Sequence, residues 1–321
     1  MVELRPKGPN RLVPPLKSAF NDAIETAHRI GLKQARAALR ASLAGADKSA
    51  PVMAEQLELT VSGGDGDLPA RLYRPEGAAP GAPLIVYFHG GGFVLGDLDT
   101  NEGMCKRIAA TARSPLLAVG YRLAPESPFP GQIDDAIAAM RWAHAHAGEL
   151  GCATDGLVIG GDSAGAYMAI TATARLNAEQ PGFVIAQLLI YPLIHIDDTD
   201  WADSVLSDTR VIGRAAVSMV RIHTGPNSPA SILDLATADT PPSLVCYGSH
   251  LDPVRPDARR YARRLVNAGV KVIEKEFPLL PHGFANMGHV APPARDAVAE
   301  IGRLSGDLIR WARARKTPVA T

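Results

Sequence analysis

Short runs of consecutive apolar residues alternate with longer segments of helical periodicity over most of the chain. The clearest run, 84–88 (LIVYF), is apolar at every position and is bounded by Pro83 and His89. A strand of this kind is buried on both faces, as in a parallel sheet covered by helices. Further strands are predicted at 56–62, 70–73, 116–119, 156–159, 185–191, 244–247 and 271–277. The helical segments between them are 100–113, 131–148, 164–178, 257–268 and 292–315. Because parallel strands need such crossovers, the pattern predicts an α/β fold with a mostly parallel central sheet flanked by helices.

Two parts of the chain depart from this alternation. Residues 16–44 carry apolar residues at three- and four-residue steps, which predicts a weakly amphipathic helix before a small polar linker. The interval 192–242 is too long for a plain connection between two strands and is expected to stand above the sheet. We pair the two as a helical cap or lid. The predicted division is 1–50 for the N-terminal part of the cap, 51–191 for the first part of the core, 192–242 for the cap insertion and 243–321 for the second part of the core.

The charge balance excludes several classes of protein. The 321 residues include 33 Lys and Arg against 33 Asp and Glu, so the formal net charge is zero. A protein that binds the phosphate backbone of a nucleic acid needs a basic excess, so we expect no nucleic-acid partner. With 46% hydrophobic and 21% charged residues, the composition is that of a folded protein with a sizeable core and not of a disordered chain.

Cysteine usage and the chain's first residues bear on location. Cys105, Cys152 and Cys246 are few, odd in number and without the C-x-x-C spacing of zinc sites, which favours a reducing compartment. The first 20 residues contain four prolines and no apolar run of signal-peptide length. No stretch of about 18 apolar residues is present, so no membrane span is expected. These features predict a cytoplasmic protein.

The sharpest chemical signal is the segment 161–165 (GDSAG), which follows a predicted strand and precedes a predicted helix. A turn this tight leaves Ser163 on a strained backbone with its hydroxyl at the carboxyl edge of the sheet. Gly161 and Gly165 remove the side chains that would clash there. The pentapeptide also occurs by chance in unrelated loops, so the strand–turn–helix context carries the inference.

A second glycine-rich segment, 89–93 (HGGGF), follows the buried strand 84–88. Three successive glycines allow backbone N–H groups to point into one cavity, where an oxyanion would be stabilised. The alternative is a phosphate-binding loop. That alternative lacks the Lys and Ser/Thr of a P-loop and the spacing of a dinucleotide-binding fingerprint.

A serine nucleophile needs a base, and the base needs an acid that holds its tautomer. Among nine histidines, His282 alone sits in a loop just past a C-terminal strand, and His289 is the reserve candidate. Asp252 follows the strand 244–247 and gives the order Ser, Asp, His. Asp257 competes for the acid role but follows Pro256 and is expected to cap the next helix.

These segments together resemble the bacterial hormone-sensitive-lipase family of carboxylesterases, which have the α/β-hydrolase fold. The matching segments, in the family's order, are 89–93, 121–126 (YRLAPE) with 129–130, 161–165, 191–192, 252–253 and 282–284. The resemblance implies a serine esterase that forms an acyl-enzyme, with Ser163 as nucleophile, His282 as base and Asp252 as acid.

The resemblance also implies roles for neighbouring groups. The oxyanion hole would be formed by the N–H groups of Gly91, Gly92 and Ala164. The supporting residues would be His89, which would brace the glycine loop, together with Gly90, Asp162 and Glu126. No metal or organic cofactor is implied. Two departures from the family pattern are Ala166-Tyr167 after the nucleophile, where the family has Gly-Asn, and Arg255-Pro256-Asp257 after the acid, where it has Arg-Asp-Glu.

The expected substrate is a neutral small-molecule ester with a short to medium acyl chain, because no extended hydrophobic lid helix is evident. Candidate pocket walls, each of which could equally be ordinary core, are Phe93, Val94, Leu95, Tyr191, Met219 and Phe284. Hydrolysis of amides, lactones or carbamates and acyl transfer would use the same residues and stay open as alternatives. A non-catalytic small-molecule receptor, as in the plant gibberellin receptors that resemble this family, is disfavoured because His282 is present. A homodimer is also left open.

Overall fold

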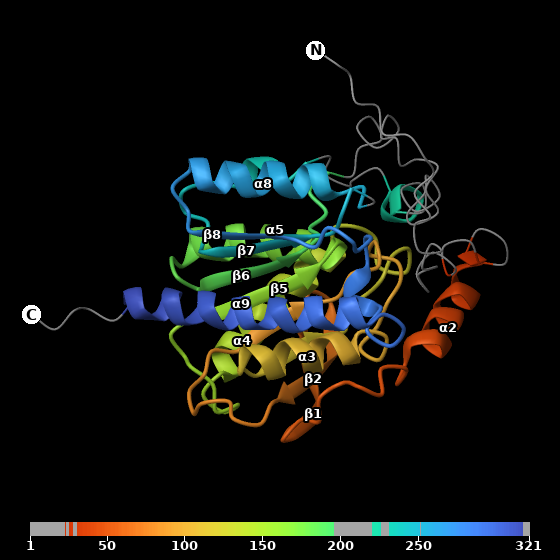
Figure 1. The fold of residues 1–321 in the computed structure, drawn as a ribbon, viewed down its shortest axis with the longest axis horizontal. Helices are drawn as coiled ribbons and strands as arrows, with labels where there is room; N and C mark the ends of the chain where they lie inside the picture. Colours follow the sequence, from red (N-terminus) through yellow and green to blue (C-terminus); the bar gives the residue numbers. More distant parts are fainter. Residues whose placement is uncertain are drawn as a thin grey trace, which may run out of the picture.

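The computed structural model describes residues 23, 26–27, 31–195, 220–225, 231–250 and 252–316. Eight strands form one sheet in the order β1-β2-β4-β3-β5-β6-β7-β8 (Figure 1). The strands are β1 (Glu55–Gly63), β2 (Gly66–Arg74), β3 (Ile85–Phe88), β4 (Leu116–Val119), β5 (Leu157–Asp162), β6 (Val184–Ile190), β7 (Ser243–Tyr247) and β8 (Val272–Glu276). Strands β4, β3, β5, β6, β7 and β8, in their order across the sheet, are all parallel. Strand β2 pairs antiparallel with β4, and β1 pairs antiparallel with β2. The predicted mostly parallel sheet is confirmed.

Burial follows the hydrophobic pattern along the strands. Every residue of β3, β4, β5, β6 and β7 is buried, because helices cover both faces of the sheet. The edge strands β1 and β8 are partly exposed instead. Strand β5 continues to Asp162, three residues beyond the predicted end at Ile159.

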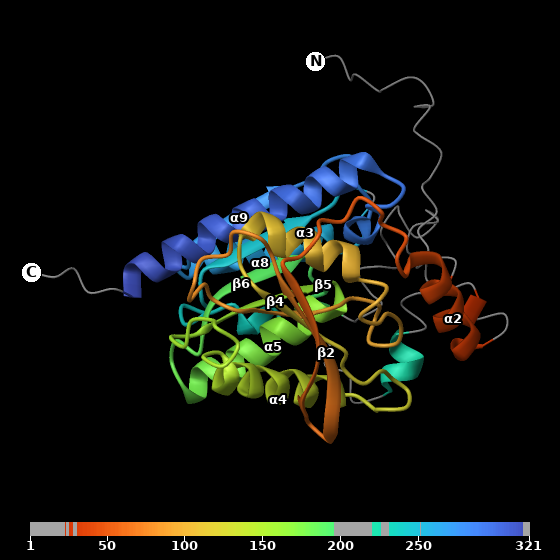
Figure 2. The ribbon, with the colours of Figure 1, turned by 90° about the horizontal axis from the view of Figure 1, so that it is seen from below.

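Helices cover both faces, as Figure 2 shows. Helices α3 (Glu102–Ala112) and α9 (Pro292–Lys316) pack against each other on one face. Helices α4 (Gly131–His146) and α5 (Ala164–Glu179) lie on the other, and α8 (Arg255–Asn267) packs against β7 and β8. Among the described helices, none has the length and apolar character needed to cross a membrane.

The strand order determines where a site can form. The chain leaves β3 for β4 on one side, whereas it leaves β5 for β6 on the other, although β3 and β5 are neighbours. In open α/β sheets, a crevice forms outside the carboxyl ends of strands at such a switch point. The loops that follow β3 and β5 are the two glycine-rich segments 89–93 and 161–165.

Helix α2 (Leu32–Leu43) lies outside these layers (Figure 1). The predicted helix over 16–44 is wrong as one continuous element, because Gly31 has a φ of 103° and is the N-cap of α2. Residues 16–22 lie outside the described part of the chain. Helix α2 belongs to a small separate apolar cluster, whose buried members are Ala23, Ala35, Leu39, Leu43, Val94, Leu95 and Ala124. The domain boundaries stay a prediction, since 196–219 and 226–230 of the cap insertion also lie outside the described residues.

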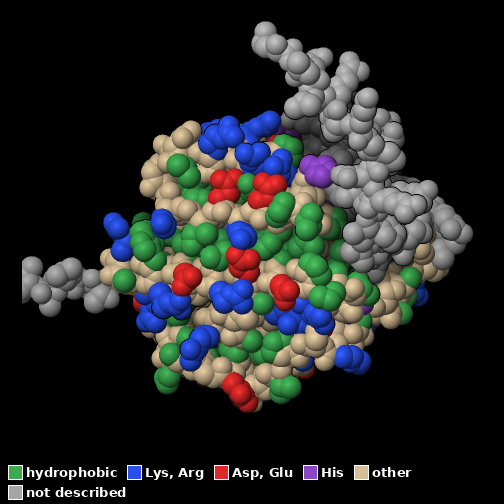
Figure 3. All heavy atoms as spheres, in the orientation of Figure 1, with side chains coloured by type: hydrophobic (Ala, Val, Ile, Leu, Met, Phe, Trp, Pro, Cys, Tyr) green, Lys and Arg blue, Asp and Glu red, His purple; other side chains and the backbone are tan. Residues whose placement is uncertain are grey.

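The zero net charge does not mean a uniform surface. On the face shown in Figure 3, basic side chains gather along the edge where α8 lies, and acidic and basic side chains are mixed elsewhere. The sequence of α8 contains five arginines, Arg255, Arg259, Arg260, Arg263 and Arg264.

Candidate active site

Ser163 lies in the turn between β5 and α5. Strand β5 ends at Asp162 and α5 begins at Ala164, so a single residue connects them. Ser163 has φ 52° and ψ −116°, a conformation that residues with a side chain rarely adopt. The turn therefore carries the backbone strain expected of a nucleophile elbow.

The two glycines of the turn are required by its close packing. A Cβ atom added to Gly161 would lie 2.4 Å from the carbonyl carbon of Gly165. A Cβ atom added to Gly165 would lie 1.9 Å from the carbonyl oxygen of Phe88. The steric reason for glycine at both positions is confirmed, and the elbow is seated directly against the end of β3.

His282 connects the serine to a buried carboxylate. Its Nε2 lies 3.0 Å from Ser163 Oγ, and its Nδ1 lies 2.9 Å from Oδ1 of Asp252, which is 0% exposed. Asp252 also accepts backbone N–H bonds from Gly248 and Val254, each at 3.1 Å. Because a carboxylate only accepts hydrogen bonds, Nδ1 is the donor and Nε2 is left to accept the serine proton. This is the geometry of a general base held by an acid.

Asp257 and His289, the alternative candidates for the acid and the base, lie in other parts of the structure. Asp257 sits in the first turn of α8 and pairs with Arg260 at 3.3 Å. The expectation that Asp257 caps α8 is wrong, because the N-cap is Val254. His289 lines a cavity of about 230 Å³. The other lining residues include Asp47, in the loop after α2, and Glu102, at the start of α3.

The loop after β3 folds back on itself through positive-φ glycines. Gly91 has φ 116° and Gly92 has φ 64°. The Gly91 carbonyl accepts the N–H groups of Val94 at 3.1 Å and Leu95 at 2.9 Å. At the neighbouring elbow, Ala164 is the first residue of α5, where N–H groups have no partner inside the helix. The positive end of a helix dipole favours negative charge at this position.

His89 packs inside this loop. Its ring stacks on Tyr121 with centroids 4.4 Å apart, and its Nδ1 donates to the carbonyl of Gly90 at 2.7 Å. The Tyr121 hydroxyl donates to the carbonyl of His89 at 2.7 Å. Burial lowers the pKa of His89, so its ring is neutral at pH 7 and acts as a fixed support.

Asp162 is a fully buried carboxylate next to the serine. It accepts the Gly90 N–H at 2.8 Å, the Tyr87 hydroxyl at 3.2 Å and the Tyr191 hydroxyl at 3.3 Å. Burial raises the pKa of Asp162 to about 6, while these hydrogen bonds oppose the shift. The sequence gives no sign of the part played by Tyr87, because this residue stands there as one position of an apolar strand.

Glu126 contacts α2. Both of its carboxylate oxygens accept hydrogen bonds from Arg36, at 2.7 and 2.9 Å. These hydrogen bonds hold the pKa of Glu126 below its usual value. The sequence gives no sign of this contact of Arg36, because an arginine on an amphipathic helix usually faces solvent.

The described candidate pocket residues are all buried to 1% exposure or less. They are Phe93, Val94, Leu95, Tyr191 and Phe284, whereas Met219 lies outside the described residues. Val94 and Leu95 pack in the cluster with α2, and the Tyr191 ring lies 4.6 Å from the ring of His282. Their role as pocket walls stays a prediction.

The first departure from the family pattern places a tyrosine in the core. Tyr167 is 0% exposed, and its ring meets those of Phe93 and Phe129 edge-on at 5.7 and 6.3 Å. At the second departure, Arg255 forms two hydrogen bonds with Glu276, each at 3.0 Å. Within the described ranges, no three His, Cys, Asp or Glu side chains come together in a group that could hold a metal ion.

Comparison with known proteins agrees with this geometry. Residues 85–286 match the model of a family described as having the alpha/beta hydrolase fold. The chain therefore belongs to the α/β-hydrolases, and within them to the hormone-sensitive-lipase family.

Three proteins illustrate the relationship. Carboxylesterase NlhH of Mycobacterium tuberculosis is 35% identical over 283 residues, covering 83% of this chain and 86% of NlhH. Ethyl acetate hydrolase of Pseudomonas putida is 31% identical over 256 residues, covering 76% of this chain and 80% of that protein. The solved structure of a hyperthermophilic esterase from the archaeon Pyrobaculum calidifontis superposes with a TM-score of 0.82 at 27% identity, covering 92% of this chain and 98% of that one. This chain is a carboxylic ester hydrolase.

Proposed function

We propose that the chain hydrolyses carboxylic esters at Ser163 through an acyl-enzyme. Ser163 Oγ attacks the ester carbonyl carbon while His282 Nε2 takes its proton. The tetrahedral intermediate collapses, and His282 donates that proton to the departing alcohol. Water then attacks the acyl carbonyl carbon while His282 Nε2 takes its proton. The second tetrahedral intermediate collapses as His282 returns that proton to Ser163 Oγ, which releases the carboxylic acid and regenerates the serine.

The observation that carries this proposal is the continuous hydrogen-bonded relay of Ser163, His282 and Asp252. A hydroxyl at 3.0 Å from Nε2 is within the range for direct proton transfer. Asp252 is buried and holds Nδ1–H, so it stabilises the imidazolium that forms during attack.

The oxyanion would be bound by the N–H groups of Gly91, Gly92 and Ala164. Support comes from the positions of the two loops, since Gly91 and Gly92 follow β3 and Ala164 follows the adjacent strand β5. Donors fixed before the reaction stabilise the developing charge without reorganisation.

The proposed substrates are small, neutral esters with short to medium acyl chains. The name of the similar P. putida protein, ethyl acetate hydrolase, supports the short end of this range. We propose a cytoplasmic location, supported by the three cysteines, which are all buried and unpaired by disulfides.

The test is the variant Ser163→Ala, assayed on p-nitrophenyl esters from acetate to decanoate. We expect loss of turnover with an unchanged unfolding transition, and labelling of the wild type but not the variant by an organophosphonate. Ser42→Ala, which changes an exposed serine of α2, serves as the control. Retained hydrolysis by Ser163→Ala would contradict the proposal, and a maximum at decanoate would contradict the proposed chain length.

A further inference from the structure

Arg36 lies in α2, yet its guanidinium reaches the loops that follow β3 and β4. Its Nε donates to the Val94 carbonyl at 2.8 Å, and its Nη2 donates to the Ala124 carbonyl at 2.7 Å. The same guanidinium binds both oxygens of Glu126. Val94 and Ala124 are each 0% exposed. Because the guanidinium is a rigid planar fork, these four bonds hold the two loops in one fixed relationship.

The Val94 carbonyl belongs to the peptide unit that ends in the Leu95 N–H. That N–H donates to the Gly91 carbonyl at 2.9 Å, and the Val94 N–H donates to the same oxygen at 3.1 Å. The Gly91 carbonyl in turn belongs to the peptide unit that ends in the Gly92 N–H. In a planar trans peptide, C=O and N–H point in opposite directions. The direction of the Gly92 N–H is therefore set by the groups that hold the Gly91 carbonyl.

We propose that Arg36 is a positioning residue for the oxyanion hole. It holds the Val94–Leu95 peptide, which holds the Gly91–Gly92 peptide, whose N–H faces the oxyanion. The inference rests on the proposed oxyanion hole, and Arg36 itself touches neither substrate nor Ser163.

The physical reason is the cost of leaving buried carbonyls without donors. Without Arg36, the Val94 and Ala124 carbonyls lose their side-chain donor in a buried environment. The loop would relax toward another donor or toward water, and the Gly92 N–H would turn away from its best direction. Stabilisation of an oxyanion falls steeply when a donor is displaced.

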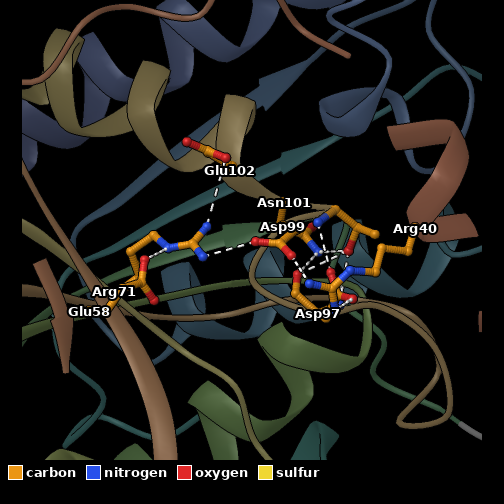
Figure 4. Close-up of polar contacts among 8 residues, drawn as sticks. Arg40, Glu58, Arg71, Asp97, Asp99, Asn101 and Glu102 are labelled. Carbon is orange, nitrogen blue, oxygen red and sulfur yellow. Dashed lines mark hydrogen bonds and ion pairs between the residues drawn. The ribbon is translucent and has the colours of Figure 1, made fainter. Parts of the chain in front are cut away.

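The competing explanation is that Arg36 only attaches α2 to the core. Arg40, one turn further along α2, provides the matched control. It pairs with Asp97 at 3.2 Å and also with Asp99, and Asp99 binds Arg71 of β2 at 2.9 Å (Figure 4). Arg40 thus attaches the same helix through carboxylates and makes no bond to the backbone of 90–95 among the interactions of the described residues.

The experiment compares Arg36→Met with Arg40→Met in the full chain. The measurements are kcat and KM on p-nitrophenyl butyrate, the rate constant of inactivation by a p-nitrophenyl phosphonate, and the thermal midpoint. For Arg36→Met we expect kcat to fall about tenfold or more with KM within about twofold, and phosphonylation to slow in proportion, since the phosphoryl oxygen occupies the same hole. For Arg40→Met we expect kcat within about twofold of the wild type, and a smaller shift in thermal midpoint than in Arg36→Met, because the Arg40 side chain is more exposed than that of Arg36.

Arg36→Lys covers the case in which Arg36→Met does not fold. Lysine keeps the charge beside Glu126 but lacks the fork that serves both carbonyls, so kcat should still fall. Wild-type kcat in either folded Arg36 variant, or an equal loss in Arg40→Met, would overturn the inference. Failure of the proposed function is a different result, namely wild-type activity that survives Ser163→Ala.

Discussion

The carboxylate of Asp162 accepts the backbone N–H of Gly90 at 2.8 Å, which joins the end of β5 to the loop that follows β3. A Cβ atom on Gly90 would lie 2.5 Å from Oδ2 of Asp162, so the contact requires glycine. The hydroxyls of Tyr87 and Tyr191 also donate hydrogen bonds to the Asp162 carboxylate. A buried acid of this kind stabilises the local geometry but is costly to ionise.

This balance predicts how Asp162→Asn changes the pH dependence of stability. Burial raises the pKa of Asp162 from 3.8 to about 6, so the folded state binds the proton more tightly than the unfolded state. Protonation of Asp162 therefore adds to the free energy of unfolding below about pH 4, and this contribution, at most about 3 kcal/mol, is lost as the pH rises through about 6. The asparagine side chain does not ionise, so this pH-dependent contribution is absent from the Asp162→Asn variant.

The measurement is the free energy of unfolding in urea at pH 4.5, 5.5 and 7.5 for both proteins. The stability of the wild type relative to Asp162→Asn should decrease steadily across this series. A difference that stays constant with pH would show that Asp162 does not titrate in this range.

A second prediction concerns Asp252. Asparagine in its place would offer an amide that no longer selects the Nδ1–H tautomer of His282. We expect Asp252→Asn to lower kcat by about 10³- to 10⁴-fold, the size of effect seen when a triad acid is neutralised. Asp257→Asn, in the same segment, should keep kcat within about twofold. Equal losses in the two variants would refute the assignment of the acid.

A third prediction tests the packing of the elbow. Gly165→Ala places a methyl group 1.9 Å from the Phe88 carbonyl oxygen, a backbone atom that cannot move without displacing β3. We expect loss of activity and a destabilisation of several kcal/mol, about the size of other severe core clashes. Gly148→Ala is the control, because its Cβ would meet only a methyl group of Thr154, at 3.5 Å. Thermal unfolding and kcat of the two variants compare them, and a native-like Gly165→Ala would contradict the model of the elbow.

Much of the fold and site follows from local patterns in the sequence. The strand predicted at 116–119 has the same limits in the structure, because an unbroken apolar run marks a strand buried on both faces. The end of β5 was missed, because Gly160 and Gly161 are poor strand formers and their place is determined by packing, with a Cβ of Gly160 meeting the Tyr87 ring at 2.8 Å.

The errors have physical causes too. The sequence predicts that α8 begins after Pro256, whereas Pro256 lies within the first turn, where its missing N–H costs nothing, so the helix begins before Asp257. Arg36 gave no signal because its partners Val94 and Ala124 are backbone carbonyls far away in sequence. Contacts of side chains with distant backbone depend on tertiary structure and leave no spacing to detect.

A last prediction concerns the hydroxyl of Tyr167. The Tyr167 hydroxyl is buried and has no hydrogen-bond partner among the described residues. A buried hydroxyl without a partner costs free energy, so Tyr167→Phe should raise the free energy of unfolding by about 1 kcal/mol while keeping the ring contacts with Phe93 and Phe129. Tyr121→Phe is the matched control: its hydroxyl donates to the His89 carbonyl at 2.7 Å, so its loss should lower stability by about 1–2 kcal/mol. Urea unfolding of both variants decides the matter, and a destabilised Tyr167→Phe would mean that this hydroxyl has a partner after all.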